Sequence, residues 1–261
     1  RAGLGYDARG NLGSRNGQAF GFDLGNRLRT APGPESYRYD AHGRRARTSN
    51  ASGALYEMYA QDGTLMWQHD TGAGFRFRHV YLNGRAVALH RLPIGSGGGE
   101  VVFTWLTDPQ GSQLAAADGP AVLQTSEYEP YGKLLNRANN NRIGYTGHVM
   151  DAGTGLIQMQ QRYYDPQLGV FLSVDPVTAY SNPISQFHRY RYAKNNPYRF
   201  TDPDGRQSVG EMIDSGANGC GPVSCAGWAL LSATWTVLGA EGVSQIADKG
   251  WGSVGGGDRA G

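Results

Sequence analysis

Three Asp-Pro pairs are the residues of this sequence best suited to chemistry: Asp165-Pro166, Asp175-Pro176 and Asp202-Pro203. Proline fixes its own φ and restricts the preceding residue to extended geometry, so each carboxylate is held at a set angle at a strand end or turn. Two carboxylates held close together do not both ionise easily, so one can act as an acid and the other as a base toward water or a peptide bond. Asp175 and Asp202 are far enough apart in the chain to meet by folding back. The alternative is that the pairs only terminate strands, and Asp165 in particular is better explained as a turn cap.

The elements that must position these residues begin with a loose repeat over residues 1–135. An aromatic residue, then Asp, then Gly or Asn recurs from Tyr6, Phe22 and Tyr39, with weaker copies near 60, 81 and 107, at steps of 16 to 25 residues. A period near twenty is typical of an array of repeats. Each unit predicts a β-hairpin, with an Asp or Asn that caps the turn and a Gly that takes a positive φ. Single hairpins cannot bury an apolar face, so we expect them to stack edge to edge in an all-β array.

Two stretches refine this prediction. In the segment 75–81, the aromatic side chains of Phe75 and Phe77 alternate with Arg76 and Arg78, which predicts a strand with one buried and one wet face. The run 94–99 predicts a flexible hairpin loop rather than a phosphate loop, because no Lys-Ser/Thr ending follows and residues 100–106 predict a strand.

Residues 162–205 carry a longer pattern: RYYDPQLGVFLS, then Asn195-Asn196-Pro197, then the Asp-Pro-Asp-Gly that ends at Gly205. This pattern resembles the core domain of rearrangement-hotspot (Rhs) or YD-repeat proteins, and the resemblance extends over about residues 1–205. It implies that the hairpins form part of a spiral shell around the polypeptide that follows, closed by the core domain. It also implies that the core is a built-in aspartyl protease with Asp175 and Asp202 as its catalytic pair, cutting the chain near Gly205 and Arg206.

The same resemblance implies the partners and the location. The chain would be the C-terminal part of a bacterial polymorphic toxin, secreted or at the cell surface. Its partners would be its own C-terminal segment inside the shell, a cognate immunity protein and a secretion-system component. The chain begins at Arg1 without a leader segment, which fits a C-terminal piece of something longer.

The chain departs from the family pattern at three places. Val170 stands where many members have Arg, Val177-Thr178 follows the pair at Asp175 without the Gly of some members, and Arg206 stands where an aliphatic residue is usual. Arg162 or Arg189 could take the place of the missing arginine in space. Two other functions therefore stay open: a non-catalytic surface or adhesion scaffold capped by the core, and a remnant that has lost its toxin domain.

Nucleic-acid and metal sites are not predicted. The net charge is only +2, and the six His are dispersed without metal-ligand spacing. The alternating aromatic and basic segment 187–192 fits a half-buried strand better than a nucleic-acid surface. No cofactor site is indicated.

The tail, residues 206–261, differs from the rest of the chain. Three basic and five acidic residues and no His argue against His-based nuclease chemistry and against binding of nucleic acid by charge. Cys220 and Cys225 fit a small disulfide loop or a reactive thiol. The apolar run 225–240 fits a buried or amphipathic helix, or a membrane-inserting one, although it is shorter than a bilayer needs. The predicted organisation is repeats at 1–135, the core domain at 136–205, and a small helical or disordered tail at 206–261.

Overall fold

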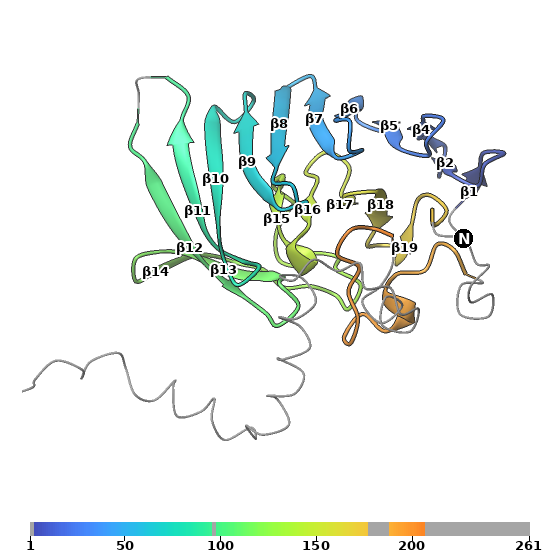
Figure 1. Cartoon of the computed structure of the whole chain (residues 1–261). Coiled ribbons are helices and arrows are strands. Elements are labelled where there is room, and N and C mark those ends of the chain that lie inside the picture. The colour runs from blue at the N-terminus through green and yellow to red at the C-terminus, as the bar shows by residue number, and fades with distance from the viewer. Residues whose placement is uncertain (1–2, 96–97, 177–187, 207–261) are drawn as a thin grey trace, which may run out of the picture. The chain divides into compact units, whose positions relative to one another are not determined.

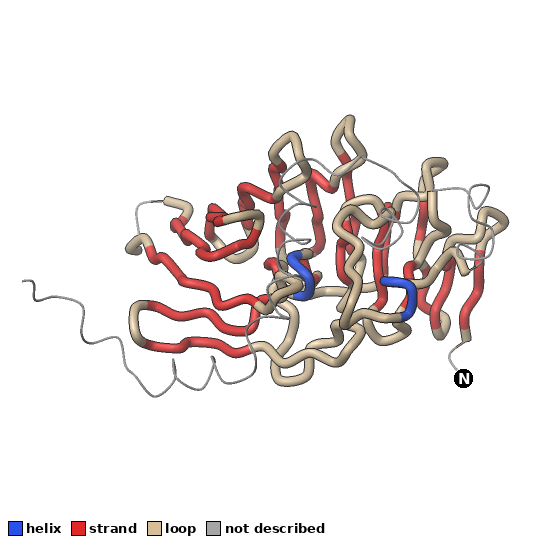
Figure 2. The backbone as a smooth tube through the Cα atoms, turned by 60° about the horizontal axis from the view of Figure 1, so that its bottom comes forward, coloured by secondary structure: helices blue, strands red, loops and turns tan. Residues whose placement is uncertain are grey.

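The structure is a computed structural model that describes residues 3–95, 98–176 and 188–206. The chain divides into two units, Arg1–Gly219 and Cys220–Gly261. The second unit, with both cysteines and the apolar run predicted as a helix, lies outside the described residues. Within the described ranges every strand pair is antiparallel, and the helices are two short 3₁₀ turns, η1 (Tyr145–Gly147) and η2 (Ala193–Asn195) (Figure 2). The all-β prediction is confirmed.

Eleven strands form the largest sheet, here called the repeat sheet, in which each strand pairs with the next along the chain (Figure 1). They are β4 (Gly21–Phe22), β5 (Leu28–Ala31), β6 (Glu35–Tyr39), β7 (Arg45–Asn50), β8 (Gly53–Tyr59), β9 (Leu65–Asp70), β10 (Phe75–Leu82), β11 (Arg85–Pro93), β12 (Val101–Thr107), β13 (Gln113–Asp118) and β14 (Ala121–Thr125). Because every connection is a hairpin, the sheet is built from contacts that are local in sequence.

Two smaller sheets complete the described fold. The N-terminal sheet contains β1 (Leu4–Tyr6), β2 (Leu12–Arg15) and β3 (Gln18–Ala19). The core sheet contains β15 (Arg142–Ile143), β16 (Val149–Met150), β17 (Ile157–Met159), β18 (Arg162–Asp165) and β19 (Val170–Phe171), again in chain order. The segment with the Asp-Pro pairs therefore begins on β18 and continues beyond the last strand.

The repeat motif works as the sequence predicts in four hairpins, where the Asp side chain caps the turn: Asp7, Asp23, Asp40 and Asp108. The Oδ1 atom of Asp40 accepts hydrogen bonds from the backbone N–H groups of His42 (2.9 Å) and Arg44 (2.8 Å), and Gly43 takes a φ of +78°. In the unit that starts at Phe22 the positive φ falls on Asn26 instead of a glycine. Asparagine tolerates this region better than other side chains, so the turn is preserved.

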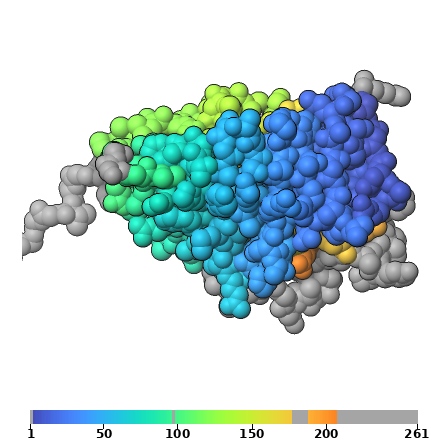
Figure 3. Space-filling view, turned by 90° about the horizontal axis from the view of Figure 1, so that it is seen from above, coloured from blue at the N-terminus to red at the C-terminus, as the bar shows by residue number. Residues whose placement is uncertain are grey.

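One face of the repeat sheet is buried against the core sheet. Phe77 is buried while its neighbours Arg76 and Arg78 are exposed, which confirms the predicted alternation in β10. Phe77 packs in one cluster with Ile143 and Val149 of the core sheet. A second cluster joins side chains of both regions: Leu12, Phe20, Leu28, Ala31, Tyr37, Leu156, Tyr163 and Leu172. Seen from above, the repeat strands cover the core, which shows only along the margin (Figure 3).

Buried ion pairs also join the repeats to the core sheet. Arg45 of β7 is fully buried, and it contacts Glu57 of β8 and Asp151 of the core, both at 2.6 Å. In a second pair the arginine comes from the core sheet: Arg142 of β15 contacts Asp70 of β9 in the repeat sheet at 3.1 Å. A buried charge is costly unless it is paired, so these contacts make the position of the core against the sheet specific.

The prediction of a strand over 187–192 is wrong where the structure describes it. Residues 189–190 form a turn, Arg191 makes an isolated bridge to Val170, and Tyr192 lies in a bend. Tyr192 is buried in an aromatic cluster with Tyr145, Tyr164 and Phe171. The chain then turns through η2, in which all three residues have positive φ. Packing of the tyrosine thus overrides the alternating pattern.

In the described parts of the chain, no helix has the length and apolar character that crossing a membrane requires.

Candidate active site around Arg162

Arg162, the first residue of β18, brings the two predicted catalytic carboxylates together. Its Nη2 atom lies 3.1 Å from Oδ2 of Asp175 and 3.2 Å from Oδ2 of Asp202. The guanidinium carbon stands 3.6 Å from the centre of the Phe171 ring, which fixes the side chain from one side. Of the two arginines that the sequence suggested as substitutes at Val170, it is Arg162 that contacts both carboxylates.

The peptide between Gly205 and Arg206 lies in the same site. Nε of Arg162 donates a hydrogen bond to the Gly205 carbonyl oxygen, and Nη2 donates another to the Arg206 carbonyl oxygen at 3.3 Å. Oδ1 of Asp202 accepts the N–H groups of Gly205 (2.9 Å) and Arg206 (3.1 Å). Both polar atoms of the Gly205–Arg206 peptide bond are therefore bound by residues of the predicted site.

Burial sets the acidity of Asp202, whose side chain is only 2% exposed. Burial raises the pKa of this carboxyl to about 7, the guanidinium of Arg162 opposes the rise, and the carboxylates of Asp204 and Asp175 add to it. The side chain of Asp175 is 20% exposed. The pair therefore consists of one buried carboxyl that binds a proton near neutral pH and one carboxylate in partial contact with solvent.

Arg189 holds the backbone of Asp175 rather than its carboxylate. The N–H of Asp175 donates to the Arg189 carbonyl at 3.1 Å, and the Arg189 side chain donates back to the Asp175 carbonyl. Nη1 of Arg162 also donates to the Arg189 carbonyl, at 3.3 Å. Arg189 thereby ties the loop that carries Asp175 to Arg162.

Asp165 stands apart from this site and caps a turn, as the sequence suggested. Its Oδ1 atom accepts the N–H groups of Gln167 (2.9 Å) and Leu168 (3.2 Å), and its Oδ2 pairs with Arg15 of β2. The carboxylate is fully engaged in holding the β18–β19 turn and the N-terminal sheet.

His148 is a site residue that the sequence did not single out. Its Nε2 lies 3.0 Å from the carbonyl oxygen of Asp202. Burial lowers the pKa of His148 to about 4, although the bond to Asp202 opposes the shift. The only signal in the sequence was its place within residues 136–205, the predicted core domain, directly after Gly144-Tyr145-Thr146-Gly147.

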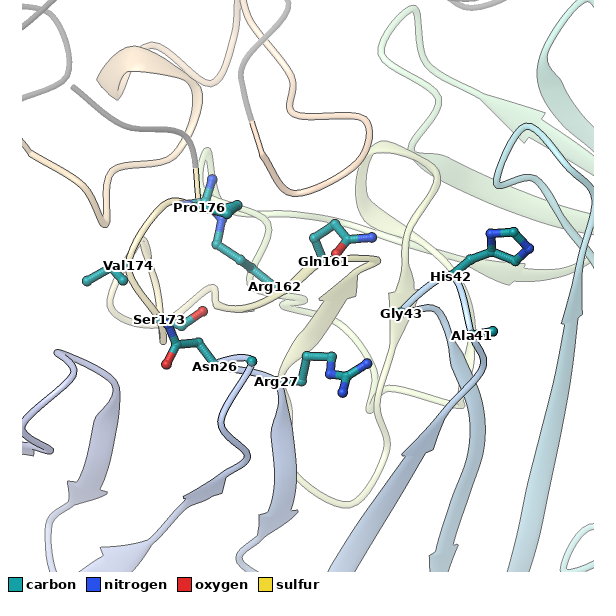
Figure 4. A pocket seen from close by; sticks show the side chains of 11 residues that line it. Asn26, Arg27, Ala41, His42, Gly43, Gln161, Arg162, Ser173, Val174 and Pro176 are labelled. Atoms are coloured by element: carbon teal, nitrogen blue, oxygen red, sulfur yellow. The ribbon is translucent and has the colours of Figure 1, made fainter. Parts of the chain in front are cut away.

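A cavity of about 350 Å³ opens beside Arg162, between the repeat turns and the core (Figure 4). Its lining comes from the turns at 25–27 and 41–43 and from Gln161, Arg162 and residues 173, 174 and 176. Figure 4 shows Pro176 and Arg162 above Asn26 and Arg27, with Val174 to the left and His42 to the right. The cavity therefore lies next to Arg162 and to Pro176, the residue that follows Asp175.

Among residues 3–95, 98–176 and 188–206, no cluster of three or more His, Cys, Asp or Glu side chains could hold a metal ion.

The hairpin array and the closing core define the class of protein. The sequence model of the Teneurin YD-shell family matches residues 3–202, and the chain belongs to this family. Among individual proteins, it is 27% identical over 214 residues to the tRNA3(Ser)-specific nuclease WapA of Bacillus spizizenii, covering 77% of this chain and 9% of WapA. It is 30% identical over 198 residues to toxin subunit YenC2 of Yersinia entomophaga, covering 67% of this chain and 20% of that subunit.

A solved structure shares the fold. The crystal structure of TcdB2-TccC3-Cdc42 superposes with a TM-score of 0.59 at 23% identity, over 80% of this chain and 11% of that chain. The chain thus spans at most a fifth of the length of each of these three relatives.

Proposed function

We propose that this chain is the C-terminal part of an Rhs-type toxin shell whose core cuts its own chain between Gly205 and Arg206. One observation carries the proposal: Arg162 contacts Asp175, Asp202 and the Gly205 carbonyl, while Asp202 contacts the N–H of Arg206. A peptide bond bound on both of its polar atoms beside two carboxylates is arranged for hydrolysis.

The roles follow from the contacts. Arg162 polarises the Gly205 carbonyl and stabilises the negative charge that develops on its oxygen. Asp175, which is in partial contact with solvent, takes a proton from a water molecule, and the water oxygen bonds to the Gly205 carbonyl carbon. As the bond from that carbon to the Arg206 nitrogen breaks, neutral Asp202 gives its proton to the nitrogen. The new carboxyl group of Gly205 then passes the second proton of the water to Asp202, and Asp175 releases the proton that it took to solvent. The products are a carboxylate at Gly205 and an amine at Arg206, with Asp202 neutral again.

The biological setting rests on the relatives. YenC2 is named a toxin subunit and WapA a nuclease, and the resemblance to Rhs proteins implies a shell that encloses the segment released by the cut. In this proposal, residues 1–135 are shell repeats, 136–205 the protease core and 206–261 the released segment. The protein is secreted or presented at the bacterial surface, with an immunity protein and a secretion-system component as partners.

The experiment is intact-mass spectrometry of the purified chain beside two variants. Asp202→Asn removes the proposed acid, and Asp118→Asn, at an exposed position at the end of β13, is the matched control. We expect the wild type and Asp118→Asn to yield a fragment ending at Gly205, and Asp202→Asn to stay intact. If the wild-type chain stays whole, the contacts around Arg162 only stabilise the core as a structural cap. That result would favour a non-catalytic scaffold or a remnant.

A further inference from the structure

The two sides of the proposed cleavage site differ in how firmly the fold holds them. On the amino-terminal side, Thr201, Asp202 and Gly205 are all buried. The N–H of Gln161 donates to the carbonyl of Asp204 at 3.1 Å. Gly205 has a φ of +74° and lies so close to the β17–β18 turn that a β-carbon on it would overlap the Met159 carbonyl oxygen. This segment is therefore packed into the core sheet rather than laid on its surface.

The carboxyl-terminal side begins at the surface. Arg206 is exposed, and its side chain makes a long ion pair of 3.7 Å with the partly exposed Asp204. Exposed pairs of this kind contribute little to binding. The remaining contacts of Arg206 are backbone hydrogen bonds to Arg162, Asp202 and Asp204. Once the peptide bond is broken, Arg206 is held among the described residues by these hydrogen bonds to its backbone, and its own side chain is packed into no part of the core.

Cleavage also changes the ligand that Arg162 holds. Before the cut, its Nε donates to a neutral carbonyl oxygen of Gly205. Afterwards Gly205 ends in a carboxylate with two oxygens and a negative charge, and departure of Arg206 frees the Nη2 contact made to the Arg206 carbonyl. A guanidinium binds a carboxylate through two parallel N–H groups more strongly than it binds a carbonyl. The cut therefore tightens the contact on the buried side while it weakens the exposed side.

We propose that the core keeps its own product: the new Gly205 carboxylate stays paired with Arg162 and closes the site to any other peptide. This inference rests on the proposed self-cleavage and adds its regulation. Each chain cuts once, in itself, and then remains a sealed core instead of becoming a free protease. The added negative charge beside Asp202 raises the pKa of that carboxyl further, so it stays neutral and does not compete for Arg162.

The test uses the self-cleaved full chain and a carboxypeptidase that removes Gly and Asp and works in moderate urea. Under native conditions we expect the N-terminal fragment to keep its Gly205 end, with trimming slowed at least about tenfold relative to the same fragment unfolded in urea. In a second measurement, the cleaved wild type is mixed with an Asp202→Asn chain that carries a tag of different mass. The tagged chain should remain whole.

The outcomes separate the two proposals. Trimming of Gly205 and Asp204 in the folded fragment, or cutting of the tagged chain, overturns product retention and leaves self-cleavage standing. A wild-type chain that never cuts overturns both. A protected Gly205 end together with an intact tagged chain supports retention.

Discussion

His148 donates a hydrogen bond from Nε2 to the backbone carbonyl of Asp202, 3.0 Å away. A carbonyl oxygen only accepts, so Nε2 must carry the proton. Since burial lowers the pKa of His148 to about 4, the ring is neutral at physiological pH and fixed in this tautomer. The contact sets the backbone from which the Asp202 carboxyl reaches the Gly205–Arg206 peptide.

Replacing His148 tests this positioning role. His148→Gln keeps an N–H donor at a similar reach, and we expect it to cleave at close to the wild-type rate. His148→Leu leaves a buried carbonyl unpaired, at a cost of about 1–3 kcal/mol, and should slow cleavage by roughly tenfold or more. The rate is followed by intact mass at several pH values, because a displaced Asp202 also shifts the pH profile. Equal rates and profiles in both variants would contradict the role.

Gly205→Ala tests the close packing at the cleavage site. The positive φ alone costs about 1–3 kcal/mol for a residue with a β-carbon, and overlap with the Met159 carbonyl adds to it. We expect loss of self-cleavage and a lower unfolding midpoint. Gly17→Ala is the matched control, because Gly17 has a similar φ of +81° but nothing within 4 Å of an added β-carbon. If both variants behave alike, the packing argument is wrong.

Arg45→Met tests the buried ion pairs between the repeat sheet and the core. The change leaves Glu57 and Asp151 buried without their cation, and breaking such a pair costs about 3–5 kcal/mol. Urea unfolding should show this loss. Arg47→Met, on the exposed face of the same strand and over the Tyr56 ring, should cost less than about 1 kcal/mol. Similar losses in the two variants would show that burial of the pair is unimportant.

Buried titrating groups predict an unusual pH dependence of stability. Burial raises the pKa of Asp202 to about 7 and of Asp151 to about 6. Each carboxyl therefore binds a proton more readily in the folded state than in the unfolded chain. Lowering the pH toward 3.8, the ordinary pKa of Asp, stabilises the fold through these two groups. Burial lowers the pKa of His79 to about 3 and of His148 to about 4, so acidification below about 6.5 destabilises it. The two effects oppose each other, and stability should change little between pH 8 and pH 5.

Removing the Asp202 carboxyl should reveal the destabilising effect that His79 and His148 have at acid pH. To keep the chain whole, the comparison is made in an Asp175→Asn background with and without Asp202→Asn. Between pH 6.5 and pH 5, the free energy of unfolding of the double variant should fall relative to the single variant by up to about 1.4 kcal/mol per pH unit. Urea titrations at four pH values measure it. Parallel curves would mean that Asp202 does not titrate above its ordinary range in the folded protein.

The sequence predicts the contacts between residues that are close in the chain, but not the contacts between residues that are far apart in it. The Asp-capped hairpins follow from turn chemistry within five residues, as at Asp40 and Gly43, and a regular array follows from their repetition. The pairing of Asp175 with Asp202 was implied by the resemblance to the Rhs core, and Arg162 was one of two arginines suggested as their partner. Arg45 and Asp151, by contrast, are 106 residues apart, and no local pattern in either segment predicts that they pair.

The strand predicted over residues 187–192 was wrong for a related reason. Alternation of aromatic and basic residues is a strand signal only where a neighbouring strand is available. Here Tyr192 is fully buried between rings from three other segments, and its neighbours follow it into a left-handed turn. Whether a tyrosine belongs to a sheet face or to an aromatic cluster depends on packing that a single sequence does not encode locally.

The N-terminal hairpin closes over the loop that carries Asp175: the N–H of Leu12 donates to the Leu172 carbonyl at 2.7 Å, and the Tyr190 hydroxyl donates to the Gly10 carbonyl at 2.6 Å. These contacts bring together residues about 160 to 180 positions apart, whereas the repeat sheet needs only neighbouring hairpins. Long-range closure comes late in folding because its entropy cost must be met first.

The site around Arg162 is thus among the last parts to assemble, and a chain that misfolds anywhere between its first hairpin and its core would keep its tail attached. Self-cleavage would act as a folding checkpoint, and refolding followed in parallel by circular dichroism and intact mass should show the sheet before the cut.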